Sequence, residues 1–99
     1  MEPKFRNQDK LVKLLAALFP ECTLYLFGSR ARKTHKPSSD IDLAIDARHK
    51  LTMEERALAL NIIAALNIPQ KVDLVDLNST IPPELTSAIL KEGIILWKK

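Results

Sequence analysis

The apolar residues of this chain recur at helical spacing in three segments. In residues 8–19, leucines return at every third or fourth position, which predicts a helix that Pro20 ends. A second helix is predicted over residues 52–67, where Thr-Met-Glu-Glu forms a capping box. A third is predicted over residues 82–91, opened by two prolines and followed by a glycine. Residues 1–7 have no such pattern and predict a loose N-terminus.

Short apolar runs between these segments predict strands. Residues 21–27, 41–46 and 71–77 are each apolar for a few positions and bounded by polar residues, glycine or proline. We expect the first two strands to be adjacent and antiparallel. Residues 94–97 are also apolar and predict either a final edge strand or a tail packed on the core. The pattern as a whole predicts an α/β fold built on a small mixed β-sheet.

Composition limits the possibilities further. The 99 residues, 46% hydrophobic and 27% charged, predict one soluble domain over residues 1–99. Cys22 is the single cysteine, so no internal disulfide can form, and no apolar run of 18 residues or signal peptide is present. We therefore expect a cytoplasmic protein without a membrane segment. A net charge of +3 suits an anionic ligand such as ATP, but is too weak to support direct nucleic-acid binding.

A glycine–serine turn follows the first predicted strand. Gly28 has no Cβ, so the backbone can approach a ligand closely at this point. Ser29 offers a hydroxyl and an N–H group, and a short helix over residues 29–32 would direct further N–H groups toward a phosphate. Arg30 and Arg32 add positive charge nearby. These features predict a phosphate-binding turn.

Two carboxylates stand at the start of the second predicted strand. Asp40 and Asp42 are two residues apart, so in an extended chain they share a face with Cα atoms about 7 Å apart. Carboxylate oxygens are ligands for Mg²⁺, and this pair could bind one ion or two ions about 3.5–4 Å apart. A hard cation would also relieve their mutual repulsion. Ser39, which precedes them, is a turn residue that shapes the entry to the strand and a further candidate for nucleotide contact.

The third predicted strand carries two more acids, Asp73 and Asp76. Because three residues separate them, their side chains lie on opposite faces of the strand. Only one of them can join Asp40 and Asp42, and the alternation alone does not choose between them.

The motif Gly-Ser-Arg-Ala-Arg at 28–32, followed by Ser-Asp-Ile-Asp-Leu-Ala-Ile at 39–45, resembles that of the DNA polymerase beta-like nucleotidyltransferase superfamily. In this form it is similar to the minimal nucleotidyltransferase branch, whose members are encoded beside HEPN-domain partners as toxin–antitoxin pairs. The resemblance extends from Leu24 to at least Leu77. It implies a polymerase beta-like palm with helices packed on one face of the sheet. Lys33 departs from the pattern, since the branch usually has glycine there, and we expect it to tighten or shift the loop.

The resemblance also implies roles for individual residues. It places the third carboxylate early in the third strand, which matches Asp73. The implied catalytic residues and ligands of two Mg²⁺ ions are Asp40, Asp42 and Asp73. The implied nucleotide-binding residues are Gly28, Ser29, Arg30 and Ser39.

The implied reaction is transfer of AMP from ATP to a hydroxyl, expected to be a tyrosine, of a cognate HEPN-domain toxin, which the modification would silence. One alternative is a non-catalytic antitoxin that masks the partner by contact, which the absence of an acceptor-binding domain favours. Another is a small-molecule nucleotidyltransferase, although such enzymes normally have a longer C-terminal region. The sequence leaves open the nucleotide specificity, the acceptor, the number of AMP units and the oligomeric state, a homo-oligomer included.

Overall fold

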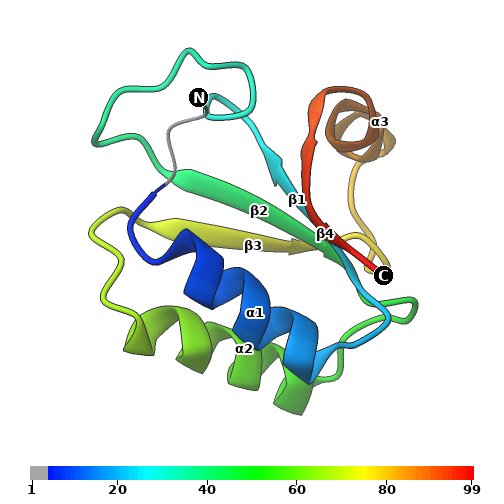
Figure 1. The fold of residues 1–99 in the computed structure, drawn as a ribbon. Coiled ribbons are helices and arrows are strands. Elements are labelled where there is room, and N and C mark those ends of the chain that lie inside the picture. The colour runs from blue at the N-terminus through cyan, green and yellow to red at the C-terminus, as the bar shows by residue number, and fades with distance from the viewer. Residues whose placement is uncertain (1–4) are drawn as a thin grey trace.

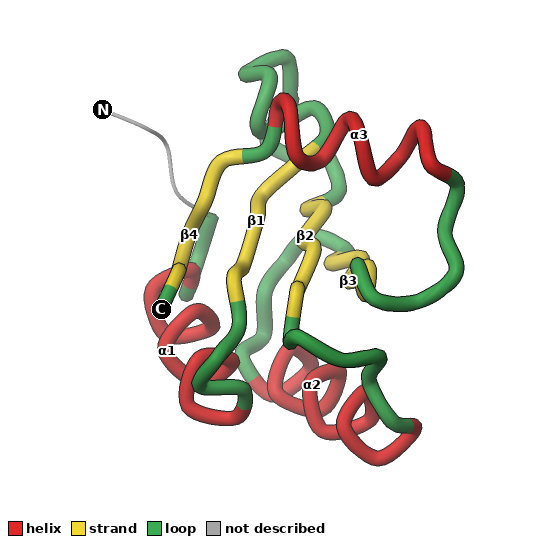
Figure 2. Tube along the Cα trace, turned by 90° about the vertical axis from the view of Figure 1, so that its right-hand side faces the viewer, coloured by secondary structure: helices red, strands yellow, loops and turns green. Residues whose placement is uncertain are grey.

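A four-stranded mixed sheet lies between two helices on one face and a third helix on the other (Figures 1 and 2). This computed structural model describes residues 5–99. The prediction of an α/β fold with a small mixed sheet is confirmed. The elements in chain order are α1 (Gln8–Leu18), β1 (Thr23–Phe27), β2 (Ile41–Asp46), α2 (Met53–Ala65), β3 (Val72–Asp76), α3 (Pro83–Glu92) and β4 (Ile94–Lys98).

The strands lie in the order β3-β2-β1-β4. β1 pairs with β2 and with β4 in antiparallel fashion, whereas β2 and β3 are parallel and are joined by a crossover through α2. The predicted antiparallel pairing of the first two strands is thus confirmed, and residues 94–97 form part of an edge strand. The single parallel pair brings the starts of β2 and β3 to the same end of the sheet, beneath the loop that follows β1 (Figure 1).

The side chains of β2 point alternately to a core face and to an open face of the sheet. Ile41, Leu43 and Ile45 are buried in one cluster with α1 residues Leu11 and Leu15. Because successive side chains alternate, the intervening residues of β2 point to the opposite face. Helices α1 and α2 cover the core face together, while α3 lies across the other face, beside β1 (Figure 2), so the expectation that the helices pack on one face holds for α1 and α2 but not for α3. The candidate site lies on the α3 face.

The N-terminal segment is more ordered than its sequence predicts. Residues 1–4 of the expected loose stretch lie outside the described residues. From Phe5 onward the prediction is wrong: Phe5 is buried in the main core, and Asn7 Nδ2 donates a 2.6 Å hydrogen bond to the Leu66 carbonyl. A single aromatic residue among polar neighbours has no periodicity, so its burial is invisible to pattern analysis.

The remaining helix signals behave as expected. Thr52 caps α2 through its side chain, which accepts from the Glu55 N–H at 3.0 Å, while Glu55 accepts from the Thr52 N–H at 2.9 Å. Pro83 occupies the first turn of α3, and Gly93 ends that helix. Over residues 5–99, no helix has both the length and the apolar character needed to cross a membrane.

Replacing Thr52 with alanine should destabilise the fold. The change removes the side-chain acceptor of the capping box, which typically lowers the free energy of unfolding by about 1 kcal/mol. Thr52→Ser keeps the hydroxyl and should unfold like the wild type in a urea titration. Equal midpoints for the alanine and serine variants would show that the cap contributes nothing measurable.

Candidate active site

The parallel pairing of β2 and β3 places two of the predicted carboxylates side by side. Asp42 is in register with Asp73, and on its other side Asp42 is paired with Phe27, the residue before Gly28. Partners in register share a face of the sheet, so Asp42 and Asp73 both point away from the core. Asp40 lies two residues before Asp42, just outside the strand. The three predicted carboxylates therefore lie at the same end of the sheet.

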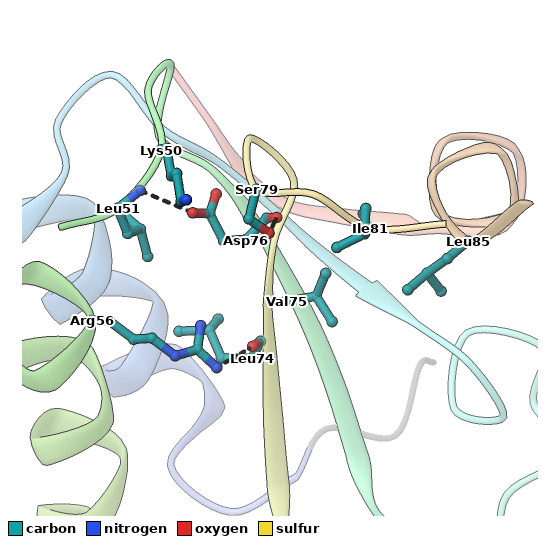
Figure 3. A pocket seen from close by; sticks show the side chains of 9 residues that line it. All are labelled: Lys50, Leu51, Arg56, Leu74, Val75, Asp76, Ser79, Ile81 and Leu85. Atoms are coloured by element: carbon teal, nitrogen blue, oxygen red, sulfur yellow. Dashed lines mark hydrogen bonds between the residues drawn. The ribbon is translucent and has the colours of Figure 1, made fainter. Parts of the chain in front are cut away.

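Asp76 has a different environment, which separates it from this group. Its side chain is 6% exposed, and its Oδ2 accepts a 2.8 Å hydrogen bond from the Leu51 N–H (Figure 3). Its Oδ1 accepts from the Asn78 N–H at 2.9 Å. These bonds fix the connection between β2 and α2 and the turn after β3. Of the two candidates for the third carboxylate, Asp73 therefore lies on the open face beside Asp42, whereas Asp76 is buried and accepts hydrogen bonds from backbone N–H groups.

A pocket of about 420 Å³ lies near Asp76 and along the edge of β3, toward the other end of the sheet (Figure 3). Arg56 lines it from α2 and donates through Nη2 to the Leu74 carbonyl at 3.2 Å, while Ile81 and Leu85 line it from the α3 side. None of the predicted site residues lines this pocket. It is therefore distinct from the carboxylate site.

Gly28 is required for the close approach of the first turn to Asp42. Its φ angle is +75°, in the left-handed region that disfavours other residues, and a Cβ at this position would overlap Asp42 Oδ2 and lie 3.2 Å from Asp42 Cγ. The turn and the carboxylate are thus in contact. This agrees with the prediction that the backbone approaches a ligand or its neighbours closely here.

The turn after Gly28 does not continue into the predicted short helix. The Arg32 N–H donates to the Gly28 carbonyl at 3.1 Å and the Thr34 N–H donates to the Ser29 carbonyl at 2.9 Å, but residues 29–32 form turns only. The helix prediction is wrong because the second bond spans five residues, so the chain widens after one turn and cannot propagate the helical pattern.

The backbone conformation of Lys33 is a second reason why no helix forms after Gly28. Its φ angle is +60°, which places a lysine in the left-handed region where glycine is favoured. The position at which the resembled branch usually has glycine is therefore one that requires this backbone conformation. Lysine adopts it here at an energetic cost.

Arg30 and Ser39 lie close to the site, and their observed contacts are with the loop. Arg30 is 9% exposed, and its Nη2 donates to the carbonyls of Pro37 at 3.3 Å and Ser39 at 3.1 Å. The Ser39 hydroxyl accepts from the Lys36 N–H at 2.9 Å, which confirms Ser39 as a turn residue. Gln70, which no sequence motif singled out, donates through Nε2 to the same Pro37 carbonyl at 2.9 Å. Direct contact of Arg30 and Ser39 with a nucleotide stays a prediction.

The electrostatics of the site centre on Asp42. Burial, and then the negative charges of Asp73 and Asp40, raise the pKa of the Asp42 carboxyl above its ordinary value, while Arg32 acts in the opposite direction. Like-charged groups this close destabilise one another's ionised forms. A cation bound between them would relieve that repulsion, so the donor set has the chemistry of a hard-cation site.

The three acids do not form a ready-made metal cage. Within residues 5–99, no three His, Cys, Asp or Glu side chains lie close enough together to hold an ion by themselves. The trio expected from the sequence shares one end of the sheet without converging on a single point. Magnesium is commonly bound by one or two carboxylates together with substrate phosphates and water, and this donor set fits such a mode.

Comparison with known proteins assigns this arrangement to a family. Residues 9–99 match the family described as Polymerase beta, Nucleotidyltransferase. The chain belongs to this nucleotidyltransferase family.

Individual relatives narrow the family to the minimal nucleotidyltransferase branch. The domain is 39% identical over 93 residues to the protein adenylyltransferase MntA of Shewanella oneidensis, covering 92% of this chain and 65% of that protein. The chain thus spans somewhat less than two thirds of that relative's length. It is also 30% identical over 86 residues to a probable protein adenylyltransferase MntA of Haemophilus influenzae, covering 87% of this chain and 75% of that one.

A solved structure described as a toxin–antitoxin with AMP-PNP shares the nucleotidyltransferase fold. It superposes with a TM-score of 0.75 at 35% identity, and the match covers 94% of this chain and 74% of that chain. The likeness therefore extends over nearly the whole domain and is not confined to the Gly-Ser and Asp motifs.

Substituting Gly28 with alanine should damage the site in a way that depends on Asp42. The left-handed backbone disfavours alanine by about 1–2 kcal/mol, and overlap with the carboxylate adds to this. In an Asp42→Ala background only the cost of the left-handed backbone remains, so Gly28→Ala should lower the free energy of unfolding by less than it does in the wild type. A double-mutant cycle by chemical denaturation measures the difference. Additive effects would mean that the turn and Asp42 are not in contact.

Asp42→Asn should raise stability at neutral pH. The raised pKa of Asp42 means that folding favours the protonated form, so its ionisation destabilises the wild type above the folded-state pKa. This penalty is lost as the pH falls below the ordinary value of 3.8. The gain in melting temperature should therefore shrink on acidification.

Asp76→Ala provides the contrast in the same measurement. It leaves the Leu51 N–H without its acceptor, which costs about 1–3 kcal/mol. A stabilised Asp76→Ala protein, or a destabilised Asp42→Asn protein, would reverse the assignment of structural and site carboxylates.

Proposed function

We propose that this chain is a Mg²⁺-dependent enzyme that transfers AMP from ATP to a tyrosine hydroxyl of a cognate HEPN-domain toxin and so acts as its antitoxin. The observation that carries the proposal is the in-register pair Asp42 and Asp73 beside the Gly28 turn, in a chain of the nucleotidyltransferase family. The pair offers adjacent carboxylates on an open face, which a phosphoryl-transfer site requires.

The relatives support the substrate and partner parts of this proposal. The Shewanella oneidensis relative is named a protein adenylyltransferase. One solved structure is described as a tri-AMPylated Shewanella oneidensis HEPN toxin in complex with an MNT antitoxin, and it matches this chain with a TM-score of 0.69 at 33% identity, covering 94% of this chain and 71% of that chain. A nucleotide analogue is named in the toxin–antitoxin structure described above. Together they favour ATP as the donor and a HEPN protein as the acceptor.

In the proposed reaction, the acceptor oxygen attacks the α-phosphorus of ATP. The new oxygen–phosphorus bond forms as the bond to the bridging oxygen breaks, and pyrophosphate leaves. Asp73 takes the proton of the acceptor hydroxyl, since it stands on the open face next to Asp42. Gly28 and Ser29 hold the triphosphate at the turn, where the absence of a Cβ allows the backbone to approach it.

Asp40, Asp42 and Asp73 are the proposed ligands for two magnesium ions. When bound, magnesium neutralises charge on the triphosphate and lowers the pKa of the acceptor hydroxyl. The carboxylates would contribute to catalysis by holding negative charge at a fixed place for the ions. Arg32 offsets part of the repulsion between the carboxylates in the free protein. Most of the rate enhancement then comes from positioning and charge stabilisation, with no covalent enzyme intermediate.

The proposal predicts AMP incorporation that depends on Asp42. Incubated with Mg²⁺, ATP and the HEPN-domain protein encoded beside it, the wild-type protein should add one or more AMP units to that partner, seen as steps in intact mass. Asp42→Asn should lower the rate by about 100-fold or more, because it removes a ligand for the charge that develops in transfer. Asp46→Asn, on the same strand but at its far end, serves as the control and should leave the rate unchanged.

Two outcomes would overturn the enzymatic part of the proposal. If the wild-type protein neutralises the partner without any gain in the partner's mass, the chain acts by masking its partner. If Asp40→Ala and Asp42→Ala together still protect cells that produce the toxin, the carboxylates are not needed for the antitoxin effect.

A further inference from the structure

A polar cluster joins three segments that lead into the candidate site. Its centre is the Pro37 carbonyl, which accepts one hydrogen bond from Arg30 Nη2 at 3.3 Å and another from Gln70 Nε2 at 2.9 Å. Arg30 also donates to the Ser39 carbonyl at 3.1 Å. One donor therefore comes from the turn that follows Gly28, the acceptors come from the loop before β2, and the other donor comes from the residues before β3.

Each of these three segments adjoins a candidate site residue, and the turn that carries Arg30 begins at Gly28. Ser39 immediately precedes Asp40, and Gln70 stands three residues before Asp73. The Ile41 N–H donates to the Lys71 carbonyl at 2.8 Å, so the pairing of β2 with β3 begins directly beside the cluster. Asp40 itself lies outside the regular strand, where the ladder does not fix its backbone on its own. The position of the loop carbonyls therefore bears directly on the position of Asp40.

Stability alone does not account for this cluster. Arg30 is 9% exposed, and among the described residues its Nε and the Gln70 Oε1 are buried without a hydrogen-bond partner. Burying a guanidinium group with incomplete hydrogen bonding is unfavourable, and an apolar side chain in its place is often neutral or stabilising. What the cluster provides is a defined geometry, since two donors on separate segments meet at one carbonyl oxygen.

We propose that Gln70 is a positioning residue of this enzyme and that it acts together with Arg30. By holding the Pro37 carbonyl between them, the two side chains fix loop 33–39 and thereby set Asp40 relative to the Asp42–Asp73 pair. Gln70 acts through the loop and does not touch the reacting atoms. The catalytic consequence rests on the proposed function, whereas the effect on the loop does not.

The test compares Gln70→Met with the wild type. Methionine keeps the length of the side chain but donates no hydrogen bond, so it removes the Gln70–Pro37 contact with little change in volume. The amides of Lys36 and Ser39, whose hydrogen bonds close the loop, should exchange with deuterium about fivefold faster or more, as NMR measures residue by residue. In AMP transfer, kcat should fall about tenfold while KM for ATP changes less than twofold, because Gly28 and Ser29, which are proposed to hold the triphosphate, keep their own hydrogen bonds to Arg32 and Thr34.

Asn78→Leu is the matched control. Asn78 also makes one 2.9 Å side-chain amide hydrogen bond, to Asp46 Oδ1, but at the far end of β2. Its loss should leave both the exchange of the loop amides and kcat unchanged. If Asn78→Leu lowers kcat as much as Gln70→Met does, the effect is a general loss of structure and the proposal is overturned.

The two readouts separate this inference from the proposed function. Unchanged loop exchange in Gln70→Met overturns the inference whatever the activity. Faster exchange with unchanged kcat also overturns it, because the loop would then not position the site. If the wild-type protein transfers no AMP, the proposed function fails, and the inference that Gln70 fixes loop 33–39 still stands or falls with the exchange of the Lys36 and Ser39 amides in Gln70→Met.

Discussion

Electrostatic repulsion between carboxylates on neighbouring strands is the constraint on which the rest of the site depends. Asp42 and Asp73 are held in register by the one parallel strand pair, and the backbone ladder leaves them no way to separate. Burial and these like charges raise the pKa of Asp42. The fold therefore holds an unfavourable interaction between carboxylates, which the proposed cation would relieve. The α2 crossover matters because it makes β2 and β3 parallel and brings their starts together.

The alternation of side chains along β2 explains why the two faces of the sheet differ so strongly. On β2, Ile41, Leu43 and Ile45 anchor the core against α1 and α2, while Asp42, which alternates with them, points to the opposite face. A shift of one residue in the β2–β3 register would bury the acids and expose the core side chains, so the core itself enforces the geometry of the site. The core and the proposed site are thus specified by alternate residues of one strand.

Much of this could be predicted from the sequence because it is local. Helix ends, strand alternation and the Gly-Ser and Asp-x-Asp motifs are all properties of consecutive residues. The choice between Asp73 and Asp76 is not local, since it depends on which residue of β3 lies on the same face of the sheet as Asp42. The buried Phe5, the contact between Asn7 and Leu66, and the role of Gln70 at the Pro37 carbonyl likewise depend on segments distant in the chain. The short helix expected after Gly28 failed because the bond between Thr34 and Ser29 widens the turn.

The guanidinium of Arg56 has a consequence beyond the fold of one molecule. β3 lies at the border of the sheet, where its unpaired backbone groups could recruit a strand from another chain. Arg56 already occupies the Leu74 carbonyl there, so an incoming strand would have to displace a charged side chain before it could add to the sheet. At the opposite border, β4 ends in Lys98, but Ile95 and Trp97 of the same strand are 52% and 39% exposed, so this border has no comparable protection. Arg56 thus protects the β3 border against the sheet-to-sheet association that leads to aggregation.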